Sequence, residues 1–508
     1  MIRRLRWSRW TPLDRLACIA VTGLTLAIAL LVFSGSFCTT NECLVSAAPR
    51  VREFTWRDRL VRARDTAFIL NFSRPMDRES VEQNLVLQIP DKPELEEPLP
   101  GQLSWAGRRL AYTLDFPAPY GNTYRLELAG ARELFARSQE TGAEVQPFSA
   151  EFRTPDRTFA YIGLEGDERG RLLLYNLTTQ EQRVLTPPDL VVTAFKPYPD
   201  GSRLLFSAVE RRRQQEGILA QQLYRVGTGL DEAGTVGDPE TVLEDQDYQN
   251  LNFDLSPDGN TIVVQRLKRD DPGDFALWAL RGDRPPARLQ DSAGGVFVIA
   301  PDNQTVATAR GEGIAVLPLD PQAEPLDFLP DFGLVLGFRN DGTAAAMVDF
   351  NRDNPDKLYT RSLYLVTNQG TRELLFETTG SILDCQFTPR GDQLYCLLTD
   401  LLEGEEYAEQ PYIAVIDVAG QQALPLMTLP NYQDTHISLA PDGLGLLLDQ
   451  IETNPTSRAA TVLQTNAGEP ITGGQLWLLL TTAKLPSSAD PPTLEPLPFN
   501  GFAPQWLP

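Results

Sequence analysis

A short turn motif recurs six times after residue 190 and constrains the fold more than any other feature. In the fullest copies proline fixes φ, aspartate or asparagine caps the turn, and glycine accepts a positive φ, so the chain reverses into a hairpin. An apolar stretch of strand character precedes and follows each turn. The copies are spaced by roughly 40 to 65 residues and read FKPYPDG (195–201), LSPDG (255–259), IAPDN (299–303), FRNDG (338–342), FTPRG (387–391) and LAPDG (439–443).

A third and a fourth strand follow each hairpin, and four antiparallel strands per repeat are typical of a β-propeller blade. The ends of the region complement each other. Residues 159–186 supply three strands but no turn-bearing first strand, which the C-terminal GFAPQWLP would provide. Six repeats and this composite predict an all-β domain over residues 155–508, a seven-bladed propeller closed by the C-terminal strand. Tandem β-sandwiches are the alternative, but they would not explain the complementary ends.

The SPDG-type repeats resemble those of the TolB-type propeller family. Some members of that family have six blades, so a six-bladed ring stays open beside the seven-bladed one. A fold does not by itself give a function, so the function is expected here by analogy with propeller architecture. We therefore expect a binding or scaffold protein whose partner is a protein or a cell-envelope component.

Residues 51–154 alternate apolar and polar residues in short runs between turn signals. The run FSRPMDRESVEQNLVLQIP, followed by LSWAGRRLAYTLDFPAPYGNTYRLELAGARE, resembles the bacterial Ig-like domains of surface proteins. That resemblance implies a β-sandwich that acts as a spacer or adhesive unit and has no catalytic residues.

An uncharged apolar stretch near the N-terminus predicts a membrane anchor. Leu16 to Phe33 are eighteen residues without charge, which as a helix would span about 27 Å, close to the bilayer core. The expected order is a basic cytoplasmic tail at 1–15, an anchor at 16–36 and a linker at 37–50, with the body on the extracytoplasmic, periplasmic side. A cleaved signal peptide is the main alternative, and a lipoprotein modified at Cys38 is a weaker one.

Composition excludes other classes of function. The formal net charge of −23 makes binding to nucleic acid improbable, because an acidic body repels phosphates. His436 is the one histidine of the chain, so a multi-histidine metal site is impossible. There is no Walker motif, Rossmann fingerprint or GxSxG elbow near a plausible triad. We expect no cofactor and no metal, and we do not expect an enzyme.

Four cysteines form two close pairs that an oxidising compartment would allow to bond. Cys38 and Cys43 flank four residues, and Cys385 and Cys396 flank the PRGD turn (389–392). A hairpin symmetric about that turn sets Cys385 opposite Cys396, at the short end of disulfide geometry. Two buried free thiols are the alternative.

The first strand of each repeat would line the central channel. Counting back from the turn, three blades have polar residues at the same two alternating positions, whereas two others have Val296 and Val298, and Val335 and Gly337. A polar arc of this kind would bind a peptide or a small ligand, although such groups also bond simply to neighbouring strands and buried water. A lactonase- or lyase-like enzyme that uses channel carboxylates is the alternative function. The polar positions are Asn252 and Asp254, Asp384 and Gln386, and His436 and Ser438.

Overall fold

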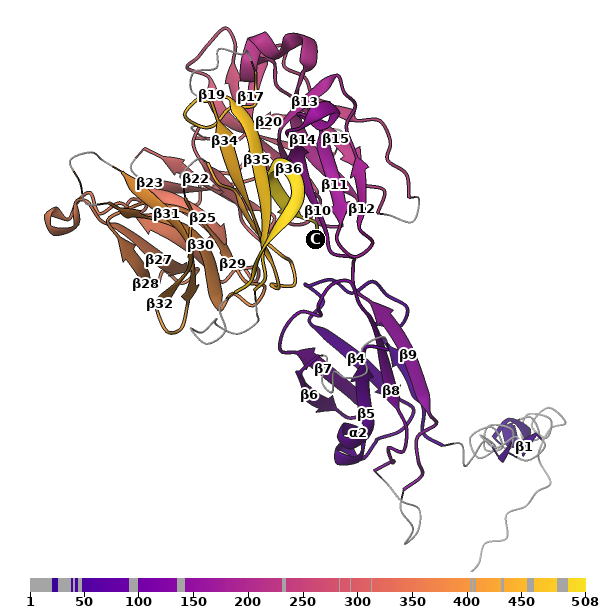
Figure 1. Cartoon of the computed structure of the whole chain (residues 1–508). Helices are drawn as coiled ribbons and strands as arrows, with labels where there is room; N and C mark the ends of the chain where they lie inside the picture. The colour runs from indigo at the N-terminus through magenta and orange to yellow at the C-terminus, as the bar shows by residue number, and fades with distance from the viewer. Residues whose placement is uncertain are drawn as a thin grey trace, which may run out of the picture.

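The structure is a computed structural model of the 508-residue chain. It describes residues 21–25, 38–39, 42–43, 48–90, 99–134, 142–230, 234–282, 284–292, 294–311, 313–402, 404, 408–430, 434–454, 461–481 and 492–508. In this part of the chain two bodies of β-sheet follow each other, a small sandwich and a larger propeller, and the C-terminus lies on the side of the propeller that faces the sandwich (Figure 1).

The sandwich consists of two antiparallel sheets over one core. Alternation in the sequence builds it: in β4 the even-numbered positions Phe68, Leu70 and Phe72 are buried, while the positions between them are partly or fully exposed. The short helix α2 (Arg78–Asn84) is capped by Asp77, whose side chain accepts from Ser80 N at 3.1 Å. The first sheet has the order β3 (Val51–Phe54), β4 (Ala67–Phe72), β7 (Arg109–Leu114), β6 (Gly101–Ala106), and the second β5 (Leu85–Gln88), β8 (Thr123–Leu128), β9 (Phe148–Arg153).

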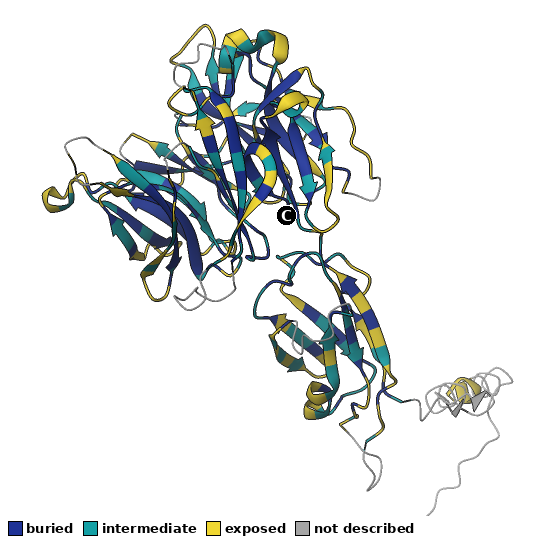
Figure 2. Ribbon diagram, in the orientation of Figure 1, coloured by how far each residue is buried: buried dark blue, intermediate teal, exposed yellow. Residues whose placement is uncertain are grey.

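Five four-stranded antiparallel sheets make up most of the β-propeller, and each follows the order of its strands along the chain. Their buried positions form the dark bands along the middle of the sheets in Figure 2. The sheets are β13 (Leu190–Pro197), β14 (Arg203–Glu210), β15 (Gln222–Gly227), β16 (Glu240–Leu243); β17 (Tyr248–Leu255), β18 (Thr261–Lys268), β19 (Phe275–Arg281), β20 (Ala287–Arg288); β21 (Phe297–Ile299), β22 (Thr305–Arg310), β23 (Gly313–Pro318), β24 (Asp327–Leu329); β25 (Leu334–Phe338), β26 (Ala344–Asp349), β27 (Arg361–Thr367), β28 (Arg372–Thr378); and β29 (Ile382–Phe387), β30 (Gln393–Leu401), β31 (Glu409–Asp417), β32 (Gln422–Thr428).

The sixth propeller sheet has seven strands and joins the two ends of the region. Its long strand β36 pairs with β35 through residues 494–500 and with β10 through residues 501–506. The C-terminal residues therefore do take the place of a first strand beside β10, as the complementary ends predict. The order is β12 (Glu181–Val184), β11 (Leu172–Asn176), β10 (Thr158–Gly163), β36 (Leu494–Trp506), β35 (Ile471–Leu479), β34 (Leu446–Thr453), β33 (Ile437–Leu439).

The six repeated turns pack against one another, and we call the surface that they form the turn face (residues 198–201, 256–259, 300–303, 339–342, 388–391 and 440–443). A Cβ on Gly259 would lie 3.0 Å from Cδ of Pro199 in the preceding turn, and one on Gly443 would lie 3.2 Å from Cδ of Pro389. Glycine is thus required here both for its positive φ and for this close approach. In the first turn the neighbour is the chain end, since a Cβ on Gly201 would lie 3.4 Å from the carbonyl oxygen of Pro508.

The N-terminal region corrects one expectation. No helix among the described residues is long and apolar enough to cross a membrane. Of the expected anchor at 16–36 the structure describes a helical turn at residues 21–25, and the basic tail at 1–15 lies outside the described residues. The prediction of a single-pass membrane anchor is therefore wrong. The described helical residues 21–25 are far fewer than the roughly 20 that a spanning helix needs.

Candidate functional site

A cavity of about 480 Å³ lies where the first strands of five propeller sheets converge. Four of the six residues predicted to line the channel meet there: Asn252 and Asp254 on β17, and Asp384 and Gln386 on β29. The cavity falls within the size range of small-molecule sites in proteins, about 300–1,000 Å³.

Asp254 is fixed by groups on two sheets. Its Oδ1 accepts from Leu255 N at 3.0 Å, and its Oδ2 accepts from Ile299 N, on the adjacent sheet, at 3.2 Å. The ammonium of Lys196 lies 3.7 Å from Oδ1. These donors hold the carboxylate in one position and compensate its charge.

Lys196 was missed by the sequence analysis although it lines the same cavity. A signal for it was present: in FKPYPDG, Lys196 stands as far before the turn glycine as Asp254 stands in its own repeat. The same count pairs Ala194 with Asn252, and both line the cavity.

Asp384 and Gln386 form a second polar group. Gln386 Nε2 donates to Asp384 Oδ2 at 3.1 Å and to the carbonyl of Ile437 at 2.9 Å, and Gln386 Oε1 accepts from Leu439 N at 2.8 Å. Gln386 thus bridges β29 and β33. Burial raises the pKa of Asp384, and the hydrogen bond from Gln386 and the more distant charge of Lys196 oppose that shift only in part.

Asn252 completes the polar arc. Its amide donates to Gln265 Oε1 at 3.1 Å, and Gln265 in turn donates to the carbonyl of Gly295 at 3.2 Å. This chain of hydrogen bonds crosses from one sheet to the next, so the polar groups of the cavity are held in place before any ligand arrives.

The part of the cavity wall between β17 and β29, at β21 and β25, is apolar. Val296 and Val298 line it as predicted, and 56% of Val296 is exposed. Counting back from the turn also placed Val335 of β25 in the channel, and this prediction is wrong. Val335 is 3% exposed and packs between sheets, whereas Leu336 lines the cavity. The register of β25 against β26 shifts between Val335 and Gly337, and a bulge of this kind re-aims the side chains that precede it.

His436 and Ser438 are not among the residues that line this cavity. They lie at the ring seam, which is the contact of β33 and β34 with the C-terminal half of β36. His436 N and Nδ1 lie 2.7 and 3.0 Å from the two carboxylate oxygens of Asp449, which also accepts from Ala503 N at 2.7 Å. Ser438 Oγ accepts from Trp506 N at 3.1 Å. Both side chains therefore contribute to the contact between β33, β34 and the C-terminal half of β36.

The cysteine pairs lie in two hairpins. Cys385 is opposite Cys396 in the register of β29 and β30, and their sulfur atoms are bonded. The pairing of β1 (Cys38–Thr39) with β2 (Glu42–Cys43) sets Cys38 opposite Cys43 in the backbone. A bridge in the second pair stays a prediction.

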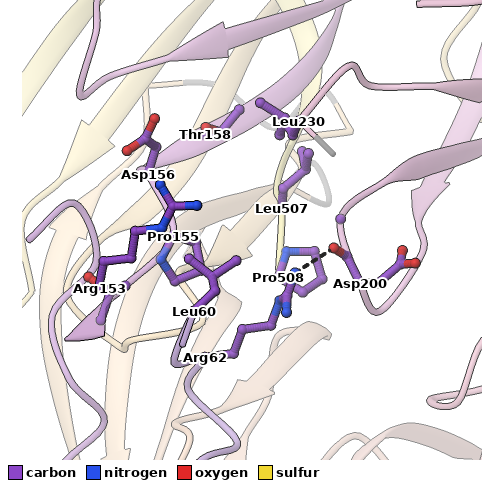
Figure 3. Close-up of a pocket in the computed structure, with 12 residues that line it drawn as sticks. Leu60, Arg62, Arg153, Pro155, Asp156, Thr158, Asp200, Leu230, Leu507 and Pro508 are labelled. Atoms are coloured by element: carbon purple, nitrogen blue, oxygen red, sulfur yellow. Dashed lines mark hydrogen bonds between the residues drawn. The ribbon is translucent and has the colours of Figure 1, made fainter. Parts of the chain in front are cut away.

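The sandwich rests on three turns of the turn face. Arg62 donates to the carbonyl of Asp200 at 2.8 Å, Tyr120 N donates to Asp442 Oδ2 at 2.9 Å, and the guanidinium of Arg390 lies 4.8 Å from the ring centre of Phe116. A cavity of about 160 Å³ remains at this joint. Figure 3 shows the Arg62–Asp200 hydrogen bond with Pro508 beside it.

Metal ligands do not gather in the part of the chain that the structure describes, since no group of three or more His, Cys, Asp or Glu side chains there could hold an ion. The polar groups of the cavity are instead bonded to the protein around them.

No protein-family model and no curated protein matches the sequence. Among solved structures, the chain is similar to oligogalacturonate lyase from Vibrio parahaemolyticus (12% identity, TM-score 0.42, 58% of this chain and 87% of that one). It is also similar to TolB from Acinetobacter baumannii (12% identity, TM-score 0.40, 83% and 86%). A third neighbour is a proposed 6-phosphogluconolactonase from Bacteroides fragilis (12% identity, TM-score 0.42, 70% and 98%).

The structural neighbours of this chain thus include TolB proteins, in agreement with the TolB-type resemblance of the repeats. Two of the three neighbours above are named for an enzymatic activity and one is not. Likeness at this level concerns the fold and does not decide between binding and catalysis. The Ig-like resemblance of the sandwich stays a prediction.

Proposed function

We propose that the chain is a binding protein that takes a segment of a partner protein into the mouth of its propeller channel. In this proposal an Ig-like domain, residues 51–154, presents a propeller, residues 155–508. The seven-stranded sheet counts as two blades, which with the five other sheets makes seven.

One observation supports this function above the others. The cavity combines a polar arc (Asn252, Asp254, Gln386) with an apolar arc (Val296, Leu336), and the polar side chains are held by hydrogen bonds to neighbouring strands. A concave site that is apolar in part and has a few fixed polar groups is typical of recognition, because little ordering entropy is lost on binding.

A plug in the channel tests the proposal. Val296 is largely exposed into the cavity, so Val296→Trp should fill the mouth without disturbing the core. Proteins that co-purify with the wild type, identified by mass spectrometry, should be lost from this variant. Val184→Trp, on the exposed outer strand β12, is the matched control and should retain them. Identical partner sets for all three proteins would argue against channel binding.

Catalysis by a channel carboxyl is the second candidate, and one observation favours it. Burial raises the pKa of Asp384, and a raised pKa favours the protonated form that a general acid requires. A lactonase- or lyase-like activity would then disappear in Asp384→Asn, which keeps the shape and removes the proton. Absence of turnover by the wild type on lactone and uronide panels would exclude this candidate.

A further inference from the structure

We propose that the ligand group received by the channel is a cationic side chain, a lysine or arginine of an extended peptide, which enters from the face opposite the sandwich and pairs with Asp384. This inference rests on the proposed binding function and adds the chemistry and the direction of the ligand.

The charge balance of the cavity points to a cation. Asp254 has two backbone donors and Lys196, and the seam carboxylate Asp449 has three donors. Asp384 accepts from the Gln386 side chain and from the backbone N–H of Cys385. Lys196 and His436 act on it only from beyond ion-pair distance, so that, among the described residues, it has no paired cation. A carboxylate in such surroundings gains most from an opposite charge, because its lost hydration is not yet compensated.

An anionic ligand fits this cavity less well. The ammonium of Lys196 is already compensated by Asp254 at 3.7 Å. The chain has a formal charge of −23, which repels anions and raises the local concentration of cations. A metal ion is disfavoured too, because the described residues contain no group of three or more ligating side chains. The favoured cation is therefore an organic one.

The direction of entry follows from the two layers of the channel. Asn252 and Asp384 stand two residues farther from the turn face than Asp254 and Gln386. At β17 and β21 the far layer is the more open one, since Asn252 and Val296 are exposed where Asp254 and Val298 are half-buried; on β13 both layers are exposed. Since the sandwich contacts the opposite end through three turns, a ligand reaches Asp384 from the far face.

The apolar arc suits the stem of a long cationic side chain. Lysine and arginine bury their methylene groups along apolar surface while the charged end seeks a polar partner. Val296, Val298 and Leu336 offer that surface at β21 and β25, and β25 is the neighbour of the strand that carries Asp384 and Gln386. A cavity of about 480 Å³ admits one such side chain with part of the flanking backbone.

Three capped pentapeptides test the inference by isothermal titration calorimetry on the whole chain. They differ only at the middle residue, which is lysine, norleucine or glutamate, so norleucine keeps the stem and removes the charge. We expect lysine to bind at least about tenfold tighter than norleucine. Asp384→Asn should abolish this difference, and Asp302→Asn, at an exposed turn, should keep it. The lysine advantage should grow as pH rises and Asp384 ionises, and the same series on His436→Gln separates this effect from the loss of charge on His436, a titratable group that also acts on Asp384.

The outcomes separate the inference from the function on which it rests. Equal affinity for lysine and norleucine, or tighter binding of glutamate, overturns the cationic ligand. If that binding is still lost in Val296→Trp, the channel binds ligands and only its charge preference was wrong. If no peptide binds and Val296→Trp retains every partner of the wild type, both proposals are overturned.

Discussion

At the scale of single residues, the carboxylate of Asp449 binds three donors at the point where the two ends of the propeller meet. Its side chain is fully buried on β34, and its two oxygens accept from His436 N, His436 Nδ1 and Ala503 N. Ala503 has a positive φ of 49°, a conformation that costs a non-glycine residue energy. The carboxylate holds this irregular point of β36 against β34, where the ends of the propeller meet.

The first prediction concerns pH. Burial alone would lower the pKa of His436, but the Asp449 carboxylate raises it above its ordinary value, with smaller contributions from Asp434 and Asp384. The protonated pair therefore stabilises the fold fully below the unfolded-state pKa, about 6.5, and is lost as pH rises through the higher folded pKa. The melting temperature of the wild type should exceed that of His436→Gln at pH 6, and the gap should shrink by pH 9. A constant gap would contradict the assignment.

The second prediction concerns the disulfide between β29 and β30. Cys385 and Cys396 are 1% and 0% exposed, and 11 positions separate them in the sequence. Closing so short a loop stabilises a fold by about 3 kcal/mol in the chain-entropy estimate. Thiol labelling of the denatured, unreduced protein should leave both cysteines unmodified, and reduction should lower the free energy of unfolding by about that amount. Labelling of both without reductant would show free thiols instead.

At the scale of elements, β36 pairs with strands from both ends of the propeller, β35 and β10. Its first half completes the sheet that begins at β33, and its second half opens the sheet that ends at β12. Phe502 and Trp506 in the second half are 5% and 6% exposed, and the rings of Trp506 and Phe159 lie 5.9 Å apart. The C-terminal strand thus connects the last repeat to the first.

The third prediction follows from this pairing. Deleting residues 501–508 removes the partner of β10 and leaves an open strand edge, which recruits other chains. The loss of Phe502, Trp506 and Leu507 from the core costs roughly 1.5–3 kcal/mol each. The truncated protein should unfold without a single cooperative transition or aggregate, and the synthetic peptide GFAPQWLP should restore it. Deletion of Pro508 alone, which leaves every paired residue in place, is the control and should melt near the wild type.

Elements were predictable from the sequence where turn chemistry decides them, and side chains less so. The six Pro-Asp-Gly-type turns located the first two strands of six repeats, and the symmetric hairpin gave the Cys385–Cys396 register. The side chain of β25 that lines the channel was predicted incorrectly. A bulge, which no residue pattern marks, places Leu336 in the cavity in place of Val335. Spacing also cannot show that Asp449, on another strand, binds the side chain of His436 and that His436 is absent from the lining of the cavity.

At the scale of the whole molecule, the turns of the turn face pack against one another within the propeller and also make the contacts with the sandwich. Asp442 illustrates this double use: its Oδ1 caps its own turn through Leu444 N at 3.0 Å, and its Oδ2 accepts from Tyr120 N and from Arg157 at 2.9 and 3.2 Å. The side chain is 2% exposed. A motif that the sequence explains as turn chemistry therefore also fixes how the two bodies are joined.

The last prediction tests this joint. Asp442→Ala leaves Tyr120 N and Arg157 without their acceptor, which should destabilise the fold by about 1–3 kcal/mol. It should also free the sandwich to move, seen as a larger radius of gyration by small-angle X-ray scattering and faster proteolysis between residues 154 and 158. Asp341→Ala is the matched control, because Asp341 caps Thr343 N in its own turn at 2.9 Å and, among the described residues, bonds to no residue of the sandwich. Equal scattering and proteolysis for the two variants would show that Asp442 acts only as a turn cap, and the sandwich would then have to be held by Arg62 and the Arg390–Phe116 contact.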